Sequence, residues 1–171
     1  MRVSRVIDAA NTWIARVIMW LIIPQIAALV YEVVARYVFN SPTTWSLDLT
    51  WLIYGTHYLM GAAYTLLVKG HIKVEVFHER MSPVRQAIVH LACYLIFFFP
   101  VIMALIYGGA EFAYLSWSAG ELSQHSSWRP VVWPFKVMMV VGFFLLFLQG
   151  ISEFIRLLAS INRKGMAKAN G

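Results

Sequence analysis

The sequence predicts an all-α membrane protein with four transmembrane helices that form a single membrane domain over residues 1–171. Hydrophobic residues make up 60% of the chain and charged residues only 13%, which is more apolar surface than a soluble domain of this size can bury. The apolar residues gather in four runs, each long enough to cross a bilayer as a helix, which takes about 20 residues. These runs cover residues 14–38, 47–68, 87–115 and 131–151.

The distribution of the 14 Lys and Arg residues predicts the orientation of these helices. Eleven lie at the N-terminus, in the gap between the second and third runs, and at the C-terminus, whereas the other two gaps and the adjoining run ends hold three. Because basic residues concentrate on the cytoplasmic side, we expect both termini and the middle gap to be cytoplasmic. The net charge of +6 is then expected to meet membrane lipid headgroups and not nucleic acid, since the charges flank spans instead of forming a patch on a polar domain.

The first run is expected to be a retained span, because it is too long for the apolar core of a signal peptide and no small-residue cleavage pattern follows it. Pro24 lies near its middle and is expected to kink the helix, which a bundle can accommodate. Glu32 and Arg36 follow with the acid four residues ahead of the base, the favourable order for an ion pair within a helix.

The short gap after the first run predicts a helical hairpin. Ser41 followed by Pro42 is typical of a helix start, with serine as the cap and proline at the first position. Asp48 then falls in the opening turns of the second helix, where the helix dipole stabilises an acid. Trp45 and Trp51 are suited to anchor this end at the membrane interface.

The middle gap, residues 69–86, is expected to lie partly in the plane of the membrane interface. Its apolar residues fit neither a helical nor a strand period, and its basic side chains can face the headgroups. Ser82 and Pro83 are expected to begin the third helix by the same cap signal.

The third run is 29 residues long, about 44 Å as a helix. This length exceeds the hydrocarbon core, so the helix is expected to be tilted, kinked at Pro100, or extended beyond the membrane. The fourth span is expected to begin near Val131 and to end before Glu153 and Arg156.

Three groups of residues raise the question of a metal or cofactor site. His71, Glu75 and His78 could share a helix face, but the zinc-peptidase pattern His-Glu-x-x-His is absent, and a polar strip facing lipid headgroups is the favoured interpretation. Cys93, the only cysteine, excludes a disulfide within the chain. We predict no metal site and no cofactor.

Two alternative functions remain open on the residues alone. A haem-bearing redox subunit would use His57 and His90, but these differ in depth by about 11 Å and axial ligands to one iron should be level. An autonomous proton-coupled exporter would use Glu32, although Arg36 neutralises that acid and the charge asymmetry indicates one fixed orientation. The favoured hypothesis is a subunit that is not an enzyme, because no nucleophile–base arrangement, phosphate loop or pair of pocket carboxylates is evident.

Three segments together carry a family resemblance. The first is residues 36–45 with Asp48, the second is residues 61–66 leading into 70–76, and the third is residues 126–136 followed by 142–150. The chain resembles the small membrane subunit of the tripartite ATP-independent periplasmic (TRAP) transporters over about residues 10–156. One departure is Asp48, where the family more often has glutamate, a change that keeps the charge.

The resemblance implies a location in the bacterial inner membrane and two protein partners. These are a large multi-span transport subunit, which carries the substrate with sodium, and a soluble periplasmic substrate-binding protein. The small subunit is then expected to pack against the fixed part of the large subunit and to help dock the binding protein. Substrates of the family are mostly organic acids.

The resemblance also implies roles for matching residues. Arg36, Trp45 and Asp48 are expected to organise the outer hairpin or touch the large subunit. Glu32, which lies outside the matching segment, is expected to have a structural or partner-contact role through its pairing with Arg36. Residues of the second motif are expected to form the cytoplasmic turn, and those of the third to contact partners, with Arg129 meeting the binding protein and Lys136 reaching outward or meeting a partner acid. The second-motif residues are Gly70, His71, Lys73 and Glu75, and the third-motif residues are Trp128, Arg129, Trp133 and Lys136.

Overall fold

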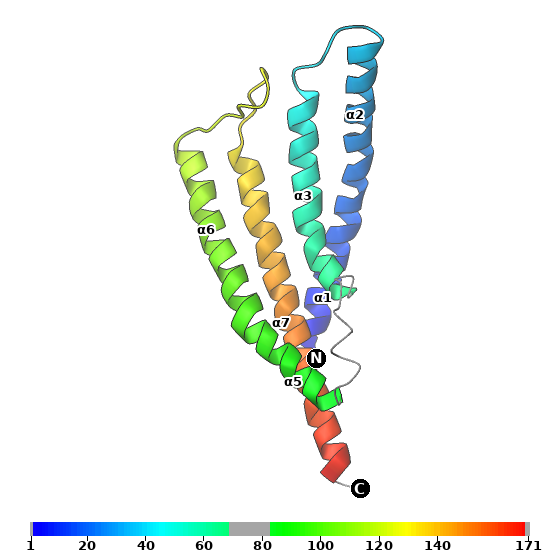
Figure 1. Ribbon diagram of the computed structural model, residues 1–171, viewed down its shortest axis with the longest axis vertical. Coiled ribbons are helices and arrows are strands. Elements are labelled where there is room, and N and C mark those ends of the chain that lie inside the picture. The colour runs from blue at the N-terminus through cyan, green and yellow to red at the C-terminus, as the bar shows by residue number, and fades with distance from the viewer. Residues whose placement is uncertain (1, 69–82, 170–171) are drawn as a thin grey trace.

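The computed structural model describes residues 2–68 and 83–169, which form four long helical rods (Figure 1). The first rod joins α1 (Arg2–Ile18), a 3-10 turn η1 (Met19–Leu21) and α2 (Ile22–Tyr37). The second is α3 (Ser46–Leu67), and the third joins α5 (Pro83–Cys93), a π-helical segment η2 (Tyr94–Phe98) and α6 (Phe99–Ser118). The fourth is α7 (Trp133–Ala169). In this part of the chain the only β-type pairing is an isolated bridge between Leu122 and Val131.

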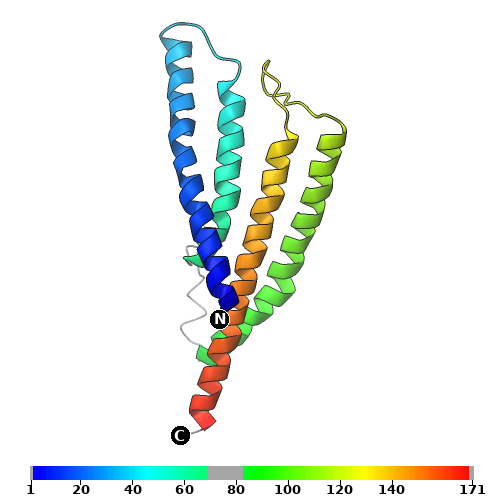
Figure 2. The same cartoon turned by 180° about the vertical axis from the view of Figure 1, so that it is seen from behind.

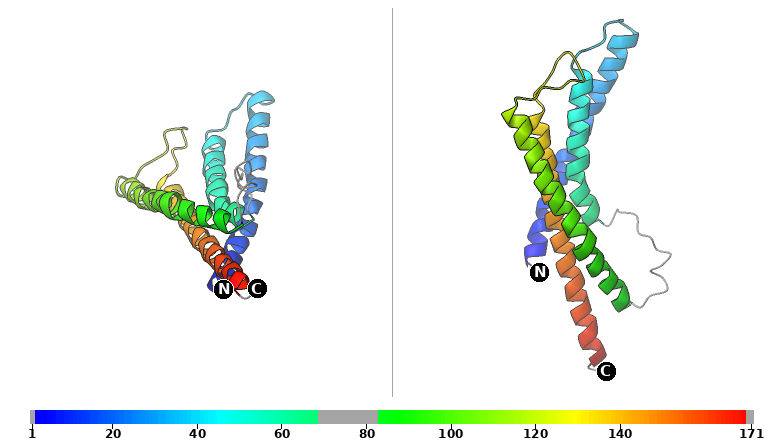
Figure 3. Two further views of the ribbon diagram at one scale, coloured as in Figure 1. Left: turned by 60° about the horizontal axis from the view of Figure 1, so that its bottom comes forward. Right: turned by 60° about the vertical axis from the view of Figure 1, so that its left-hand side comes forward.

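The rods converge at one end of the molecule and fan out at the other. Both chain ends lie at the convergent end, which we name the terminal end, and the loops 38–45 and 119–132 lie at the opposite end, which we name the loop end (Figures 1 and 2). At the loop end the rods form two separated pairs, α2 with α3 and α6 with α7, and further views show the same fan (Figure 3). Helix α7 is central, because it contacts α1, α3, α5 and α6.

Three of the rods are long and apolar enough to cross a membrane, and these segments are 4–37, 88–118 and 133–161. They contain the predicted first, third and fourth spans, except for Val38, Ala87, Val131 and Val132 at the outermost positions. Helix α3 is 22 residues long, about 33 Å at helical rise, but its Thr, Tyr, His and Gly residues keep it out of this group. The all-helical class is thus confirmed, whereas the fourth span and the orientation of the termini stay predictions.

The breaks in the first and third rods each precede a proline. A proline ring clashes with the carbonyl four residues earlier and leaves it without a hydrogen bond. For Pro24 that carbonyl belongs to Trp20, the middle residue of the 3-10 turn, and for Pro100 it belongs to Ile96, the middle residue of the π-helical segment. Both departures from α-helix therefore stand where the prolines predict them.

The predicted start of the second helix at Ser41–Pro42 is wrong. Helix α3 begins at Ser46, with Trp45 at the cap position and no side-chain cap hydrogen bond. The backbone N–H of Ser41 instead donates to the carbonyl of Ala35 at 2.9 Å, next to Asn40 with φ of +50°. This segment closes the end of α2, so the serine–proline pair marks the end of one helix and not the start of the next.

Helix α5 begins at Pro83, as predicted, but the last helix is longer than its apolar run. Helix α7 runs to Ala169, well beyond the expected limit before Glu153. The guanidinium of Arg156 donates to the Glu153 carboxylate at 2.8 Å, a pair three residues apart on one helix face. The helix therefore continues through this charged pair, and the segment that is apolar enough to cross a membrane reaches residue 161.

Glycines allow α3 and α7 to approach closely. At Gly142 of α7 an added Cβ would lie 3.1 Å from the backbone carbon and oxygen of Leu59 in α3. At Gly55 of α3 it would lie 2.5 Å from the ring of Phe135 in α7. Close backbone approach at small residues is the usual way for membrane helices to gain packing contacts.

Candidate functional site

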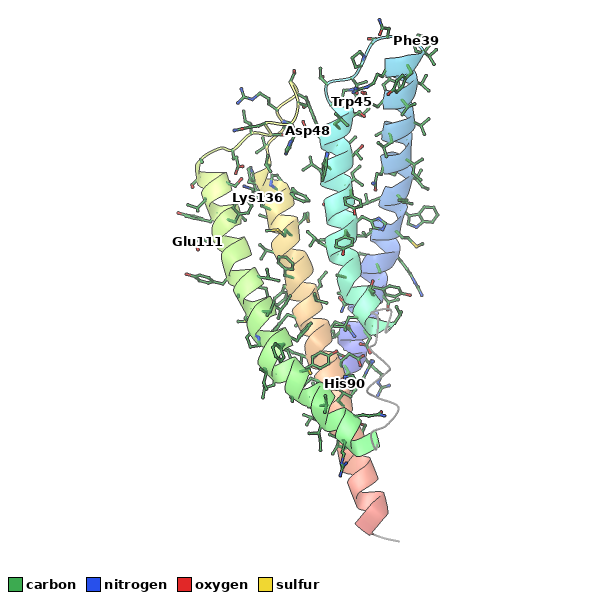
Figure 4. The ribbon with its side chains drawn as sticks, viewed as in Figure 1. Phe39, Trp45, Asp48, His90, Glu111 and Lys136 are labelled. Carbon is green, nitrogen blue, oxygen red and sulfur yellow. The ribbon has the colours of Figure 1, made fainter. Side chains whose placement is uncertain are left out.

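Eight of the residues predicted to matter lie at or near the loop end, on α2, α3, α7 and the two loops. They are Glu32, Arg36, Trp45, Asp48, Trp128, Arg129, Trp133 and Lys136. The second-motif residues Gly70, His71, Lys73 and Glu75, together with His78 and the predicted interfacial segment up to Ser82, lie outside the described residues. Figure 4 labels Trp45, Asp48 and Lys136 at the loop end.

Asp48 connects the two helical hairpins. It lies in the first turn of α3, is only 3% exposed, and points toward the loop 119–132 (Figure 4). Its carboxylate accepts a hydrogen bond from the hydroxyl of Ser123 at 2.6 Å and another from the hydroxyl of Ser126. The same two hydroxyls accept the backbone N–H groups of His125 and Trp128, both at 3.2 Å. Asp48 therefore fixes the shape of a loop that belongs to the other hairpin.

Glu32 holds the loop of the first hairpin in place, as Asp48 does for the loop of the other hairpin. Its buried carboxylate accepts hydrogen bonds from the Arg36 guanidinium, with the Nε donor at 2.9 Å, which confirms the predicted ion pair. The other carboxylate oxygen accepts the backbone N–H of Thr43 at 3.0 Å and also its hydroxyl. Glu32 thus holds the loop 38–45 against the end of α2, and Trp45 stacks on Tyr31 with ring centroids 5.8 Å apart.

Lys136 is buried near the start of α7 and meets an acid of its own chain. Its ammonium donates to the carboxylate of Glu121 and lies 3.5 Å from the centre of the Phe112 ring on α6. Hydrogen bonding from Lys136 lowers the pKa of the Glu121 carboxyl. The Lys136 side chain is 6% exposed and that of Glu121 is 44% exposed. The pair therefore joins a buried cation to an acid that water can still reach.

A cavity of about 450 Å³ lies between α3, the loop 119–132 and the start of α7. Polar groups of Asp48, Glu121, Ser123 and Gln124 line one part of it, and its remaining lining is Trp51, Leu52, Leu122, His125, Pro130, Val132 and Phe135. Both acids already accept hydrogen bonds from their own chain. The cavity is therefore a shaped recess suited to accommodate a protruding group of another molecule.

The remaining third-motif residues border this region. Trp128 is 48% exposed, and Arg129 is exposed with φ of +46°, a left-handed backbone conformation that turns the chain within the loop 119–132. Trp133 faces a different place, an apolar cleft of about 540 Å³ between α6 and α7 that Tyr114 and Trp117 also line. The loop end thus presents an exposed tryptophan and arginine beside the polar recess.

A second polar cluster, at the terminal end, was not predicted. The carboxylate of Asp8 in α1 accepts hydrogen bonds from Gln149 and Ser152 of α7, both at 3.1 Å, and from the Arg156 guanidinium. The amide of Asn11 donates to the Gln149 side-chain carbonyl at 2.7 Å. Gln149 and Ser152 are fully buried. These bonds fasten α1 to α7.

Sequence reasoning missed the hydroxyl donors and the terminal-end cluster for different reasons. Ser123, Ser126 and Thr43 are small polar residues in polar loops, and nothing local distinguishes them from solvated ones. Gln149, in contrast, is a polar residue inside a long apolar run, and such residues face a partner in a bundle. That signal could have indicated a polar contact at this position.

The two histidines considered as haem ligands have different surroundings in the structure. His57 lies on α3, and its buried Nδ1 has no hydrogen-bond partner among the described residues. His90 lies on α5 and borders an apolar pocket of about 530 Å³ with Cys93 and Tyr94. Within residues 2–68 and 83–169, no three His, Cys, Asp or Glu side chains gather as a group that could hold a metal ion.

Comparison with known proteins gives one family. A family model described as "Tripartite ATP-independent periplasmic transporters, DctQ component" matches residues 25–160, which is most of the chain. No curated protein matches the chain. The matched range includes α3, α5, α6, both loops of the loop end and the acids Glu32, Asp48 and Glu121.

Proposed function

The chain belongs to the family of DctQ components of tripartite ATP-independent periplasmic transporters, and on this premise we propose that it is the small auxiliary membrane subunit of a sodium-driven transporter that imports organic acids. This is a family of transporter components and not of enzymes. In the proposed complex the chain supports a large transport subunit and helps to dock a periplasmic binding protein. It lies in the bacterial inner membrane, with four spans and both termini cytoplasmic.

The family match carries the proposal, and the construction of the loop end supports the docking role. The buried acids Glu32 and Asp48 are both used to hold loops in shape. Preformed loops are what a docking surface needs, because no ordering cost then falls on binding. Trp128 and Arg129 are exposed on that surface, and Trp and Arg are the residue types that contribute most at protein interfaces.

Reconstitution in liposomes tests the role in transport. The large subunit and the binding protein should import an organic acid down a sodium gradient only when this chain is present, and the chain alone should transport nothing. Transport by the chain alone would support an exporter and overturn the proposal. A Soret absorbance band in the purified chain would support the redox subunit instead.

The docking role has its own test. Trp128→Ala and Arg129→Glu should raise the concentration of binding protein needed for half-maximal uptake, while the yield of the membrane complex stays at the wild-type level. Arg5→Glu, which changes an exposed arginine at the terminal end, is the matched control and should leave that concentration unchanged. An equal effect of all three variants would remove the docking role.

A further inference from the structure

Helix α3 carries an outward face with a regular spacing. Its members are Leu47, Trp51, Tyr54, Tyr58, Gly61 and Thr65, which follow one another at intervals of four, three, four, three and four residues. This repeat keeps side chains on one narrow side of a helix. It is the spacing by which one helix packs along another, since each repeat averages 3.5 residues.

The upper part of this face is open in the structure. Leu47, Trp51, Tyr54 and Tyr58 are 42%, 65%, 53% and 68% exposed, and the two tyrosine rings stack with centroids 6.2 Å apart. The side of α3 that holds Gly55 and Leu59 packs against α7. Tyr54 and Tyr58 therefore form an ordered, exposed surface on a side of α3 other than the one that packs on α7.

Lipid tails are a poor occupant for this surface. Tyr58 lies about 18 Å along α3 from Ser46 and about 14 Å from Leu67, and Tyr54 lies about 12 Å from Ser46. Both hydroxyls would then face the hydrocarbon region if α3 spans the membrane. Among the described residues neither hydroxyl makes a hydrogen bond, and a hydroxyl without a partner in hydrocarbon is costly. A protein partner can supply the acceptors that lipid tails lack.

Gly61 supplies a second, independent observation on the same face. An added Cβ at Gly55, Gly142 or Gly150 would contact another helix, but at Gly61 no described atom lies within 4 Å. Glycine in a membrane helix is typical of a place where another backbone approaches closely. Gly108 on α6 is equally open, so what marks Gly61 as a place for close approach is its position in line with the exposed tyrosines of α3.

The lower hydropathy of α3 and its position agree with a covered face. The other three rods are apolar enough to cross a membrane on composition alone, whereas α3 is not among them. Trp51, at the upper part of the face, also lines the loop-end cavity. One partner could therefore lie along α3 and reach the recess beside Asp48.

We propose that this face of α3 is the surface on which a transmembrane helix of the large transport subunit packs, with Gly61 as the point of closest backbone approach and with Tyr54 and Tyr58 donating hydrogen bonds to the partner. The inference rests on the proposed function and adds the site of contact to it.

Photo-crosslinking in the assembled complex tests the position of the face. Benzoylphenylalanine, an aromatic residue larger than tyrosine, replaces Tyr54, Tyr58 or Met103 in the full chain expressed with the large subunit. Met103 is the control, because it is 52% exposed on α6, lies within the most apolar of the candidate spans and carries no hydroxyl that lipid would leave without a partner. Positions 54 and 58 should give adducts with the large subunit, and position 103 should not.

A bulky residue at position 61 tests the close approach. Gly61→Leu should lower the yield of co-purified large subunit by about tenfold, while the chain expressed alone keeps its wild-type melting temperature, because no described atom obstructs the new side chain. Gly108→Leu, at an equally open glycine on α6, should leave the yield unchanged.

The outcomes separate the inference from the proposed function. Wild-type yield with Gly61→Leu, adducts only from position 103, or adducts between two copies of this chain would overturn the assigned face while the subunit role stands. A wild-type chain that fails to co-purify with the large subunit would instead overturn the proposed function. Adducts from positions 54 and 58 together with loss of complex in Gly61→Leu alone would support the inference.

Discussion

The carboxylate of Asp48 accepts a hydrogen bond from the hydroxyl of Ser123 at 2.6 Å, although 75 residues separate them in the chain. The contact lies at the loop end, where α3 and α7 belong to separated pairs of helices (Figure 2). The packing of α3 on α7 positions the hairpins, and Asp48 adds a polar connection across the gap.

Asp48→Ala should destabilise the chain and loosen this loop. The substitution leaves the buried hydroxyl of Ser123 without its acceptor, which costs about 1–3 kcal/mol. Thermal unfolding in detergent measures the loss, and co-purification with the large subunit should fall as well. Thr44→Ala, at an exposed position in the first loop, is the control, and equal melting temperatures for the two variants would contradict the role of Asp48.

Removing the charge of Glu121 and removing the charge of Lys136 should lower the melting temperature by different amounts. Glu121→Gln leaves the buried ammonium of Lys136 without a counter-charge, which is strongly unfavourable. Lys136→Met removes the buried charge and leaves Glu121 in contact with water, so it should lower the melting temperature less. A larger loss in Lys136→Met than in Glu121→Gln would contradict this account, because it would make the carboxylate, and not the ammonium, the replaceable member.

The pH dependence of stability should show the lowered pKa of Glu121. Because hydrogen bonding from Lys136 lowers the folded-state pKa below the ordinary value of 4.5, this carboxylate stabilises the fold fully above that value. The contribution is lost as the pH falls through the lower folded-state pKa. The difference in melting temperature between wild type and Glu121→Gln should thus be constant near neutral pH and shrink in acid. A difference that grows below pH 4.5 would contradict this assignment.

A larger side chain at Gly142 should destabilise the contact between α3 and α7. A leucine there would press on the Leu59 backbone, which already lies 3.1 Å from the position of a Cβ, and overpacking of this kind costs about 1–3 kcal/mol. Unfolding in detergent should register that loss for Gly142→Leu. Gly108→Leu serves as the comparison, since no described atom lies within 4 Å of its Cβ position.

The cluster around Asp8 should control the attachment of α1. In Asp8→Ala the side chains of Gln149 and Ser152 lose an acceptor, and the Arg156 guanidinium loses its bond to α1. Amide hydrogen exchange in residues 4–18 should then accelerate, while exchange in α6 stays unchanged. Uniform acceleration across all helices would indicate general destabilisation instead.

Features set by neighbouring residues could be predicted from the sequence. The Glu32–Arg36 pair depends on a spacing within one helix, and the breaks before Pro24 and Pro100 depend on the chemistry of proline itself. The start of α5 at Pro83 follows the same local logic. The Ser41–Pro42 signal failed because a serine and a proline also occur just after a helix, and only the hydrogen bond from Ser41 to Ala35 distinguishes the two cases.

Features set by distant residues could not be predicted. Asp48 was expected to organise its own hairpin, yet its partners Ser123 and Ser126 lie in the other one. Lys136 was expected to reach outward or to meet a partner, and its acid is Glu121. Such pairs depend on how the rods are arranged. The spacing of apolar residues does not predict that arrangement, because an apolar helix face can contact either lipid or another helix.

The π-helical segment at residues 94–98 holds one more residue than an α-helix of equal turns. In a regular α-helix one extra residue would rotate everything beyond it by about 100°. The wider π-turn takes up most of that rotation, so α5 and α6, which both contact α7, keep nearly the faces that a regular helix one residue shorter would give them. Deleting one residue within 94–98 should therefore restore a regular α-helix and leave His90 and Cys93 near their present side of the rod, whereas a deletion inside α6 would rotate them by about 100°.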